Sequence, residues 1–255
     1  MSLKNLIKKL ESDKFYYSDY EFVTNSQLGL IKKDVRTYKM MRDNPDLMEE
    51  TLPMIFGRAY HVAMLEPNEF HRKVSICKSS TRATKIFKEF KKENESCPTI
   101  ILEKEYDKIM AMQDKLFQYS RIKNLLNTEG EREIANAWLD QDTDVYCKGK
   151  ADYRNGNILV DLKTTIDASY HSFSRSCEKY GYDRQSAFYM DGFNCNEFIF
   201  IVQEKEPPYN VSIFNAGKEF SQRGRDEYKH LLEIYRKYFI DNEKSIDEYL
   251  ITETL

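Results

Sequence analysis

The pattern of hydrophobic and polar positions along this chain changes its period near residue 130. Before that point apolar residues recur every three or four positions, which predicts a mostly helical part over residues 1–130, with helices at 54–65 and 101–127. After it, side chains alternate between apolar and polar or form short apolar runs, as β-strands do. Residues 131–255 are therefore predicted to form a sheet core, with strands at 131–139 and 145–153, a third strand after a turn at 155–157, a helix at 180–193, strands at 197–203 and 209–214, and a helix at 218–239. This order predicts an α/β fold, a mixed sheet with helices on its faces, in one domain over residues 1–255.

One hairpin of the predicted sheet carries the most chemistry. Residues 155–157 (Asn-Gly-Asn) are typical of a turn between paired strands, so Asp152 before the turn is predicted to lie beside Asp161 after it. Asp161 and Lys163 are two residues apart and share one strand face, while Leu162 points into the core. Two converging carboxylates repel each other unless a cation lies between them, and their oxygen atoms suit Mg²⁺ or Mn²⁺. With a lysine beside the ion, the set is typical of metal-assisted hydrolysis of a phosphodiester.

A purely structural role is the main alternative, because a surface hairpin with two aspartates and a lysine is common. The context favours a catalytic role. Val160 and Leu162 are predicted to bury one face of the strand, and charged side chains on the other face of a central strand are costly to bury unless they have a function. His61 poses the same choice. It lies four residues after Gly57 on one face of its helix, where the glycine is predicted to let the helix backbone approach a sheet closely. A lone helical histidine, however, is more often a satisfied, partly buried residue.

Composition restricts the class of protein further. Hydrophobic residues make up 41% of the 255, enough for a sizeable core, and no apolar run is long enough to span a membrane. Charges interrupt the apolar residues of the N-terminus, which argues against a signal peptide. The five cysteines are scattered and include no C-x-x-C pair, which argues against zinc and iron–sulfur sites and for reduced thiols in a cytoplasmic protein.

The net charge of −3 does not by itself indicate nucleic-acid binding. Between Arg72 and Lys92, however, eight basic residues accompany a single acid. Such a cluster suits contact with phosphates, although charge runs are also common on solvated surfaces. We therefore keep this segment as a candidate DNA contact.

Short motifs follow one another in a fixed order between residues 56 and 212. They are Gly57 to His61 with Leu65-Glu66-Pro67 after it, Glu133 five residues before Trp138, Gly149-Lys150-Ala151-Asp152, Asp161-Leu162-Lys163, Gln185 to Tyr189, and the strand–loop–strand segment 200–212. In this order they resemble the PD-(D/E)XK nuclease superfamily, in its RecB-like branch, and there the RecE-type (exonuclease VIII) exonucleases of phages and prophages. The resemblance implies a restriction-endonuclease-like core with flanking helices and an N-terminal helical region, a nuclease module over residues 1–255.

Two positions depart from the motifs of this superfamily. Ala151 stands where the nominal pattern has a proline before the aspartate, as is frequent in the RecB-like branch. Glu131 lies on the same predicted strand face as Glu133, so the sequence leaves open which of the two matches the acid of the family.

The resemblance also implies roles for individual residues. Asp152 and Asp161 hold the metal ion with the backbone carbonyl of Leu162, and His61 and Glu133 are further ligands. Lys163 orients or deprotonates the attacking water. Gln185 holds the DNA backbone or the nucleophile, and Tyr189 packs behind it. Mg²⁺ is the expected ion, with Mn²⁺ as a substitute. The expected catalytic residues are Glu133, Asp152, Asp161, Lys163 and Gln185, and the expected DNA contacts are Arg58, Arg82, Lys85, Arg184, Gln185 and Tyr189.

The activity that the resemblance implies is processive 5′→3′ digestion of linear double-stranded DNA, which leaves 3′ single-stranded overhangs for recombination by strand annealing. A single-strand annealing protein of the RecT type is the expected partner, and a homo-oligomeric ring around the duplex is the expected assembly. Three alternatives remain open: another PD-(D/E)XK activity, such as a single-strand exonuclease or an endonuclease; a non-catalytic DNA-binding scaffold; and an interaction protein whose hairpin carboxylates are incidental.

Overall fold

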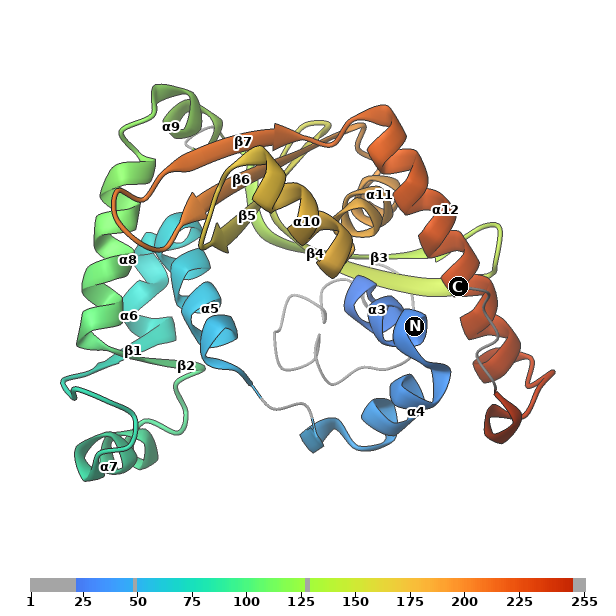
Figure 1. Ribbon diagram of the computed structural model, residues 1–255, viewed down its shortest axis with the longest axis horizontal. Coiled ribbons are helices and arrows are strands. Elements are labelled where there is room, and N and C mark those ends of the chain that lie inside the picture. Colours follow the sequence, from blue (N-terminus) through green and yellow to red (C-terminus); the bar gives the residue numbers. More distant parts are fainter. Residues whose placement is uncertain (1–21, 48–49, 127–128, 250–255) are drawn as a thin grey trace.

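A five-stranded mixed sheet in the order β3-β4-β5-β6-β7 forms the centre of the computed structural model, which describes residues 22–47, 50–126 and 129–249 (Figure 1). β3 (Glu131–Asp140), β4 (Val145–Asn155) and β5 (Ile158–Thr165) are successive antiparallel strands. β6 (Glu197–Glu204) lies parallel to β5, and β7 (Val211–Asn215) pairs antiparallel with β6. The predicted mixed α/β sheet is confirmed. The first 21 residues of the predicted helical part lie outside the described residues.

Helices cover both faces of this sheet, as Figure 1 shows with α5 and α8 on one side and α11 and α12 on the other. Alternation along β5 assigns the two faces, because Val160 and Leu162 pack with α5 and α8 while Leu159 packs with α10 and α11. The first face holds α5 (Leu52–Leu65), α8 (Glu103–Leu116) and α9 (Ser120–Leu126). The second holds α3 (Asn25–Lys33), α4 (Val35–Asp43), α10 (Tyr170–Tyr180), α11 (Tyr182–Phe193) and α12 (Lys218–Tyr235). Among the described residues, none of the helices has the length and apolar character needed to cross a bilayer.

A smaller unit lies between α5 and α8 along the chain. It contains α6 (Phe70–Lys73), β1 (Val74–Cys77), α7 (Lys85–Glu93) and β2 (Thr99–Leu102), and β1 pairs parallel with β2. Short helical turns complete the described chain at Pro45–Leu47, Pro67–Glu69, Arg236–Ile240 and Ile246–Glu248.

Two predicted helices have different bounds in the structure. The helix predicted over 101–127 is wrong in two places: its first two residues belong to β2, and the chain breaks again between α8 and α9. Glu105 causes the first boundary, because its carboxylate accepts a hydrogen bond from the Leu102 N–H and so caps α8. The helix predicted over 180–193 begins at Tyr182. Gly181, with φ of 65°, ends a separate helix, α10, that the sequence pattern did not predict.

Substitution by alanine at two helical glycines should have opposite effects on the free energy of unfolding. The expectation that Gly57 permits close approach to the sheet is wrong, because a Cβ there meets nothing within 4 Å. Gly224 of α12 is the close contact instead, because its Cβ would lie 2.1 Å from the Asp183 carbonyl oxygen on α11. We expect Gly224→Ala to lower the free energy of unfolding by about 1–3 kcal/mol or more. Gly57→Ala, the matched control, should raise it by about 1 kcal/mol, since alanine favours helix. Urea denaturation measures both, and unchanged stability of Gly224→Ala would contradict this packing.

Candidate metal and catalytic site

Strand β4 parts from both of its neighbours at Asp152, and the candidate site lies at this point. The pairing of β4 with β5 ends at Tyr153 and Val160, one residue before Asp152 is reached. On the other side, the β3–β4 register passes from Arg132 and Tyr153 to Ile134 and Ala151, and the facing residues Glu133 and Asp152 are not paired. Glu133 has φ of 49°, a left-handed conformation that is uncommon outside glycine. The backbone of β5 is therefore free to bind a side chain here, and the Leu162 N–H donates to Asp152 Oδ2 at 2.7 Å.

Helix α5 brings His61 to the same point. Pro53 lies in the first turn of this helix, and Pro67 follows its end. A buried hydrogen bond of 2.7 Å from the Tyr60 hydroxyl to Gln203 Oε1 on β6 fixes the helix to the sheet. The Gln203 side-chain amide in turn donates to a carbonyl of α8 at 2.8 Å. Because both polar side chains are fully buried and satisfied, they determine how α5 lies and thereby where His61 points.

Three side chains from separate elements form a first cluster. His61, Glu133 and Asp152 each offer a ligand atom, and these atoms lie within 4.8 Å of one another. His61 Nδ1 is 3.4 Å from Asp152 Oδ1, and His61 Nε2 is 2.9 Å from the Leu162 carbonyl oxygen. The structure thus brings together the predicted side-chain ligands from α5, β3 and β4, with the predicted backbone carbonyl beside them.

Asp161 belongs to a second cluster rather than to the first. Its Oδ2 atom is 2.8 Å from Lys163 Nζ, and its Oδ1 atom accepts a hydrogen bond of 2.6 Å from Gln185 Nε2 on α11. Lys163 Nζ donates to Gln185 Oε1 at 3.1 Å, which closes a triangle of three side chains. The ring of Tyr182 covers this triangle, with its centroid 4.5 Å from Lys163 Nζ. Lys163 and Gln185, two of the predicted catalytic residues, are thus in direct contact, and Tyr182 is an addition that the motifs did not indicate.

The two glutamates at the start of β3 have different surroundings. Glu131 is 63% exposed and lies 4.0 Å from Arg154, away from the cluster. Glu133 lies in the cluster, with its carboxylate 3.0 Å from Lys150 Nζ. The geometry therefore places Glu133 and not Glu131 at the site. Lys150 is a residue that sequence reasoning missed, although its spacing of two from Asp152 was a signal that they share a strand face.

The charges of the two clusters perturb one another. Burial raises the pKa of Glu133, and the Asp152 carboxylate adds to this by repulsion. Burial also raises the pKa of Asp161. Burial alone would raise the pKa of Asp152, but the His61 charge and its hydrogen bond lower it overall. Burial opposes the charged form of His61, yet the Asp152 carboxylate raises the pKa of its ring to about 9. The pKa of Lys163 is raised, because Asp161 outweighs the cost of burial. An imidazolium therefore offsets the carboxylates in the metal-free protein.

The proton on the His61 ring should make the affinity for a metal ion depend on pH. An imidazole must lose its proton to become a ligand, so the affinity for Mg²⁺ should rise about tenfold per pH unit from about pH 7 and level off above about pH 9. The metal-free protein should show the opposite trend, because the folded-state pKa of His61 lies above its ordinary value of 6.5. Its contribution to stability is complete below about pH 6.5 and is lost as the pH rises through about 9. Calorimetric titration with Mg²⁺ measures the first effect, and His61→Asn should flatten it. An affinity of the wild-type protein that does not change over this range would contradict the assignment.

The donor set fits a divalent ion. Two carboxylates and a backbone carbonyl are hard oxygen donors that suit Mg²⁺ and Mn²⁺, and the single imidazole suits Mn²⁺ better than Mg²⁺. Asp161 Oδ2 is buried and accepts no hydrogen bond of acceptable geometry in the described part of the chain, although the Lys163 ammonium is near. A buried carboxylate oxygen in this situation is the kind of atom that a cation engages.

The predicted DNA contacts fall into two groups. The three arginines among them bind other groups of the protein. Arg58 donates to the Pro98 carbonyl and to Glu50, and Arg82 forms a bidentate pair with Glu105. Arg184 is buried and donates to Glu227 and Asn25. Lys85 on α7 remains 89% exposed and lies 3.5 Å from Glu89. The basic run is less positive than its sequence indicates, because Arg72 and Lys73 pair with Glu69 and Glu66 just before it.

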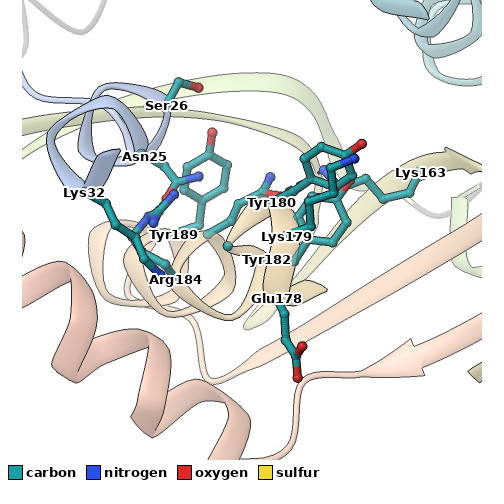
Figure 2. Close-up of a pocket in the computed structure, with 13 residues that line it drawn as sticks. Asn25, Ser26, Lys32, Lys163, Glu178, Lys179, Tyr180, Tyr182, Arg184 and Tyr189 are labelled. Atoms are coloured by element: carbon teal, nitrogen blue, oxygen red, sulfur yellow. Dashed lines mark hydrogen bonds between the residues drawn. The ribbon is translucent and has the colours of Figure 1, made fainter. Parts of the chain in front are cut away.

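A cavity of about 480 Å³ adjoins the second cluster. Figure 2 shows Lys163, Tyr180 and Tyr182 at one end of it and Asn25 and Arg184, beside α3, at the other. Gln185 and Tyr189 also line it, and Tyr189 packs against Phe188 and Phe193 behind. Two of the predicted catalytic residues, Lys163 and Gln185, thus line the cavity. Its full lining is Asn25, Ser26, Gly29, Lys32, Lys163, Glu178, Lys179, Tyr180, Gly181, Tyr182, Arg184, Gln185 and Tyr189.

Comparison with known proteins adds to this geometry. The model of a family described as a PDDEXK-like domain of unknown function (DUF3799) matches residues 32–247. No curated protein matches the sequence. The crystal structure of a "putative exonuclease" from Eubacterium rectale resembles the chain with a TM-score of 0.64 and 12% identity, over 96% of this chain and 95% of that one. This likeness shows a shared fold.

Two further solved structures resemble the chain at lower similarity. A phage-related exonuclease from Haemophilus somnus 129PT has a TM-score of 0.36 and 13% identity, over 69% of this chain and 94% of that one. An alkaline exonuclease from Laribacter hongkongensis has a TM-score of 0.29 and 13% identity, over 73% and 97%.

Proposed function

Because the chain belongs to the family of PDDEXK-like domains of unknown function (DUF3799), we propose that it is a nuclease that hydrolyses phosphodiester bonds of DNA with a divalent metal ion. One observation carries the proposal: the cluster of His61, Glu133 and Asp152 meets the Asp161–Lys163 pair where β4 parts from β5. Carboxylates, an imidazole and a lysine gathered at one point of the sheet are the groups that such hydrolysis needs.

Mg²⁺ is the proposed ion, with Mn²⁺ as a substitute. His61, Glu133 and Asp152 would hold it, and the Leu162 carbonyl and Asp161 would be further oxygen ligands. When bound, the ion would polarise the phosphate and offset the charge that develops on it during hydrolysis.

Lys163 is the residue that we propose to orient the attacking water. Asp161 and Gln185 hold its ammonium on two sides, and the Tyr182 ring covers it, so its position is determined before any substrate binds. Because Asp161 raises the pKa of Lys163, the residue carries a proton. An ammonium at this position can orient the water and stabilise the negative charge of the transition state. Gln185 has a positioning role, since its amide links Asp161 to Lys163.

We further propose that the enzyme is an exonuclease that digests linear double-stranded DNA in the 5′→3′ direction and leaves 3′ overhangs. The order of motifs, similar to RecE-type exonucleases, supports this mode of action, and the cavity next to Lys163 supports binding of a strand end. A RecT-type annealing protein is the proposed partner, and a homo-oligomeric ring the proposed assembly. Both come from the same resemblance.

Dependence on a DNA end tests this mode of action. The wild-type protein is incubated with Mg²⁺ and linear duplexes labelled at one 5′ end or one 3′ end, with closed circular duplex and with single-stranded DNA. Early release of the 5′ label, with the circle intact, is expected. Cutting of the circle would show an endonuclease, and early release of the 3′ label would show the opposite direction. Faster digestion of single strands would favour a single-strand exonuclease. Binding of DNA without any cleavage by folded protein would favour a scaffold.

A further inference from the structure

Two tyrosines form a stack that runs from the protein surface to the catalytic lysine. The Tyr180 side chain is 54% exposed, and its ring stacks on that of Tyr182 with centroids 5.7 Å apart and an interplanar angle of 30°. Tyr182 in turn covers Lys163 Nζ at 4.5 Å. Phe173 and Phe200 support Tyr182 from the core, each with its ring centroid 5.8 Å away. The inner ring is therefore held firmly, while the outer ring is open to solvent.

The turn between α10 and α11 is built to place both rings side by side. Gly181, the residue between them, has φ of 65°, and a Cβ there would lie 2.8 Å from the Arg184 guanidinium. A side chain at this position would therefore be strained and would displace the arginine. The turn thus links the position of the exposed ring to the position of a buried cation.

The cavity beside these rings has a cationic end. Arg184 is only 4% exposed, and its Nε and Nη1 atoms donate to Asn25 and Glu227. Its Nη2 atom donates no hydrogen bond to any residue in the described ranges, and the guanidinium lines the cavity. The first turn of α11, a helix of 12 residues without a side-chain cap, begins at the same place. A guanidinium that lines the cavity and a helix start without a side-chain cap both favour an anion.

These features fit one class of ligand. A volume of about 480 Å³ is within the range of pockets that hold small organic ligands. An aromatic face at one end and cationic groups at the other match a nucleobase and a phosphate. We propose that the cavity binds the terminal nucleotide of the strand to be cut, with its nucleobase stacked on Tyr180. The Nζ atom of the exposed Lys179 lies 5.1 Å from the centroid of the Tyr180 ring. The incoming base would displace this side chain from the ring.

The inference rests on the proposed nuclease function and adds a substrate requirement to it. Every base has a π face, so stacking on Tyr180 accepts all four bases but rejects an abasic terminal sugar. It also links substrate binding to the catalytic residues, because the ring that receives the base lies on the ring that covers Lys163.

Fluorescence tests the stacking without cleavage. The probe is a short duplex with 2-aminopurine at one 5′ end, and the proteins are wild type, Tyr180→Ala and Tyr180→Phe, with Ca²⁺ in place of Mg²⁺. Tyr119→Ala is the matched control, because Tyr119 is also exposed, also carries a lysine 5.5 Å from its ring, and does not line the cavity. We expect quenching by wild type, Tyr180→Phe and Tyr119→Ala, and about tenfold weaker binding without quenching for Tyr180→Ala. Equal melting temperatures show that the variants fold.

The cleavage rate of the same proteins separates this inference from the proposed function. With Mg²⁺, the wild-type protein should cut a normal end about tenfold faster than an abasic end, and Tyr180→Ala should lose this preference. Normal cleavage with no quenching, or quenching that survives in Tyr180→Ala, would overturn the stacking and leave the nuclease function intact. Quenching without any cleavage would instead overturn the nuclease function and leave the binding site.

Discussion

Replacement of Lys163 by alanine is expected to lower the rate of DNA cleavage by about two to four orders of magnitude. Its ammonium is held by Asp161 and Gln185 at 2.8 and 3.1 Å, and the described structure places it between the predicted metal ligands and the cavity. Stability should change much less than activity. Asp161 retains its hydrogen bond from Gln185, and its raised pKa lets it take up a proton when the lysine is absent. Initial rates on 5′-labelled linear duplex, measured beside the melting temperature, separate the two effects.

Lys218→Ala is the control for this experiment, because Lys218 is exposed at the start of α12 and does not line the cavity. It should cleave DNA at the wild-type rate. DNA binding by Lys163→Ala in Ca²⁺ should also stay close to that of the wild type. Substantial turnover by Lys163→Ala would mean that this lysine is structural.

Saturation with Mn²⁺ is expected to raise the melting temperature of the wild-type protein by about 5–10 °C. A ligand that binds only the folded state at one hundred times its dissociation constant stabilises that state by about 2.7 kcal/mol, and a chain of this length gains about 2–4 °C per kcal/mol. Repulsion between Glu133 and Asp152 makes the gain larger, because the pKa of Glu133 is raised by burial and by its neighbour. Differential scanning fluorimetry with Mn²⁺ or with EDTA measures the shift.

Asp152→Asn should abolish this stabilisation, because Asp152 supplies an oxygen to the cluster and also binds the Leu162 N–H and His61. Asp142→Asn is the matched control, since Asp142 is 74% exposed beside Lys229. An equal shift in Asp152→Asn and in wild type would place the metal elsewhere.

The hairpin of β4 and β5 could be predicted from the sequence because its signals are local. The turn residues and the two-residue spacing of Asp161 and Lys163 lie within a few positions of one another, and the structure keeps this arrangement. Glu133 could not be distinguished from Glu131 by alternation, because its positive φ interrupts the strand at that position. Asp161 was predicted beside Asp152, and the sequence did not indicate that its carboxylate also accepts a hydrogen bond from Gln185 on α11.

Elements and contacts that depend on distant partners were harder to predict. Helix α10 has only two buried residues, Phe173 and Cys177, and the sequence analysis did not predict it. The last two residues of β2, predicted as the start of a helix, form a strand because β1 pairs with them. Arg184 was predicted at the DNA, and no local pattern indicated that Glu227 and Asn25 also bind its guanidinium. The cavity joins residues 25–32 with residues 163–189, and no local pattern indicates such a meeting.

Cleavage of a 5′-labelled linear duplex, followed over time with Mg²⁺, Mn²⁺ or EDTA, tests the central claim most directly. Wild type, Lys163→Ala and Asp152→Asn are compared at equal concentration after each is shown to be folded. The site described here predicts rapid release of label by the wild type with either metal, none with EDTA, and a rate at least about a hundredfold lower for both variants. Metal-independent cleavage, equal rates for the variants, or no cleavage by folded wild-type protein would contradict it.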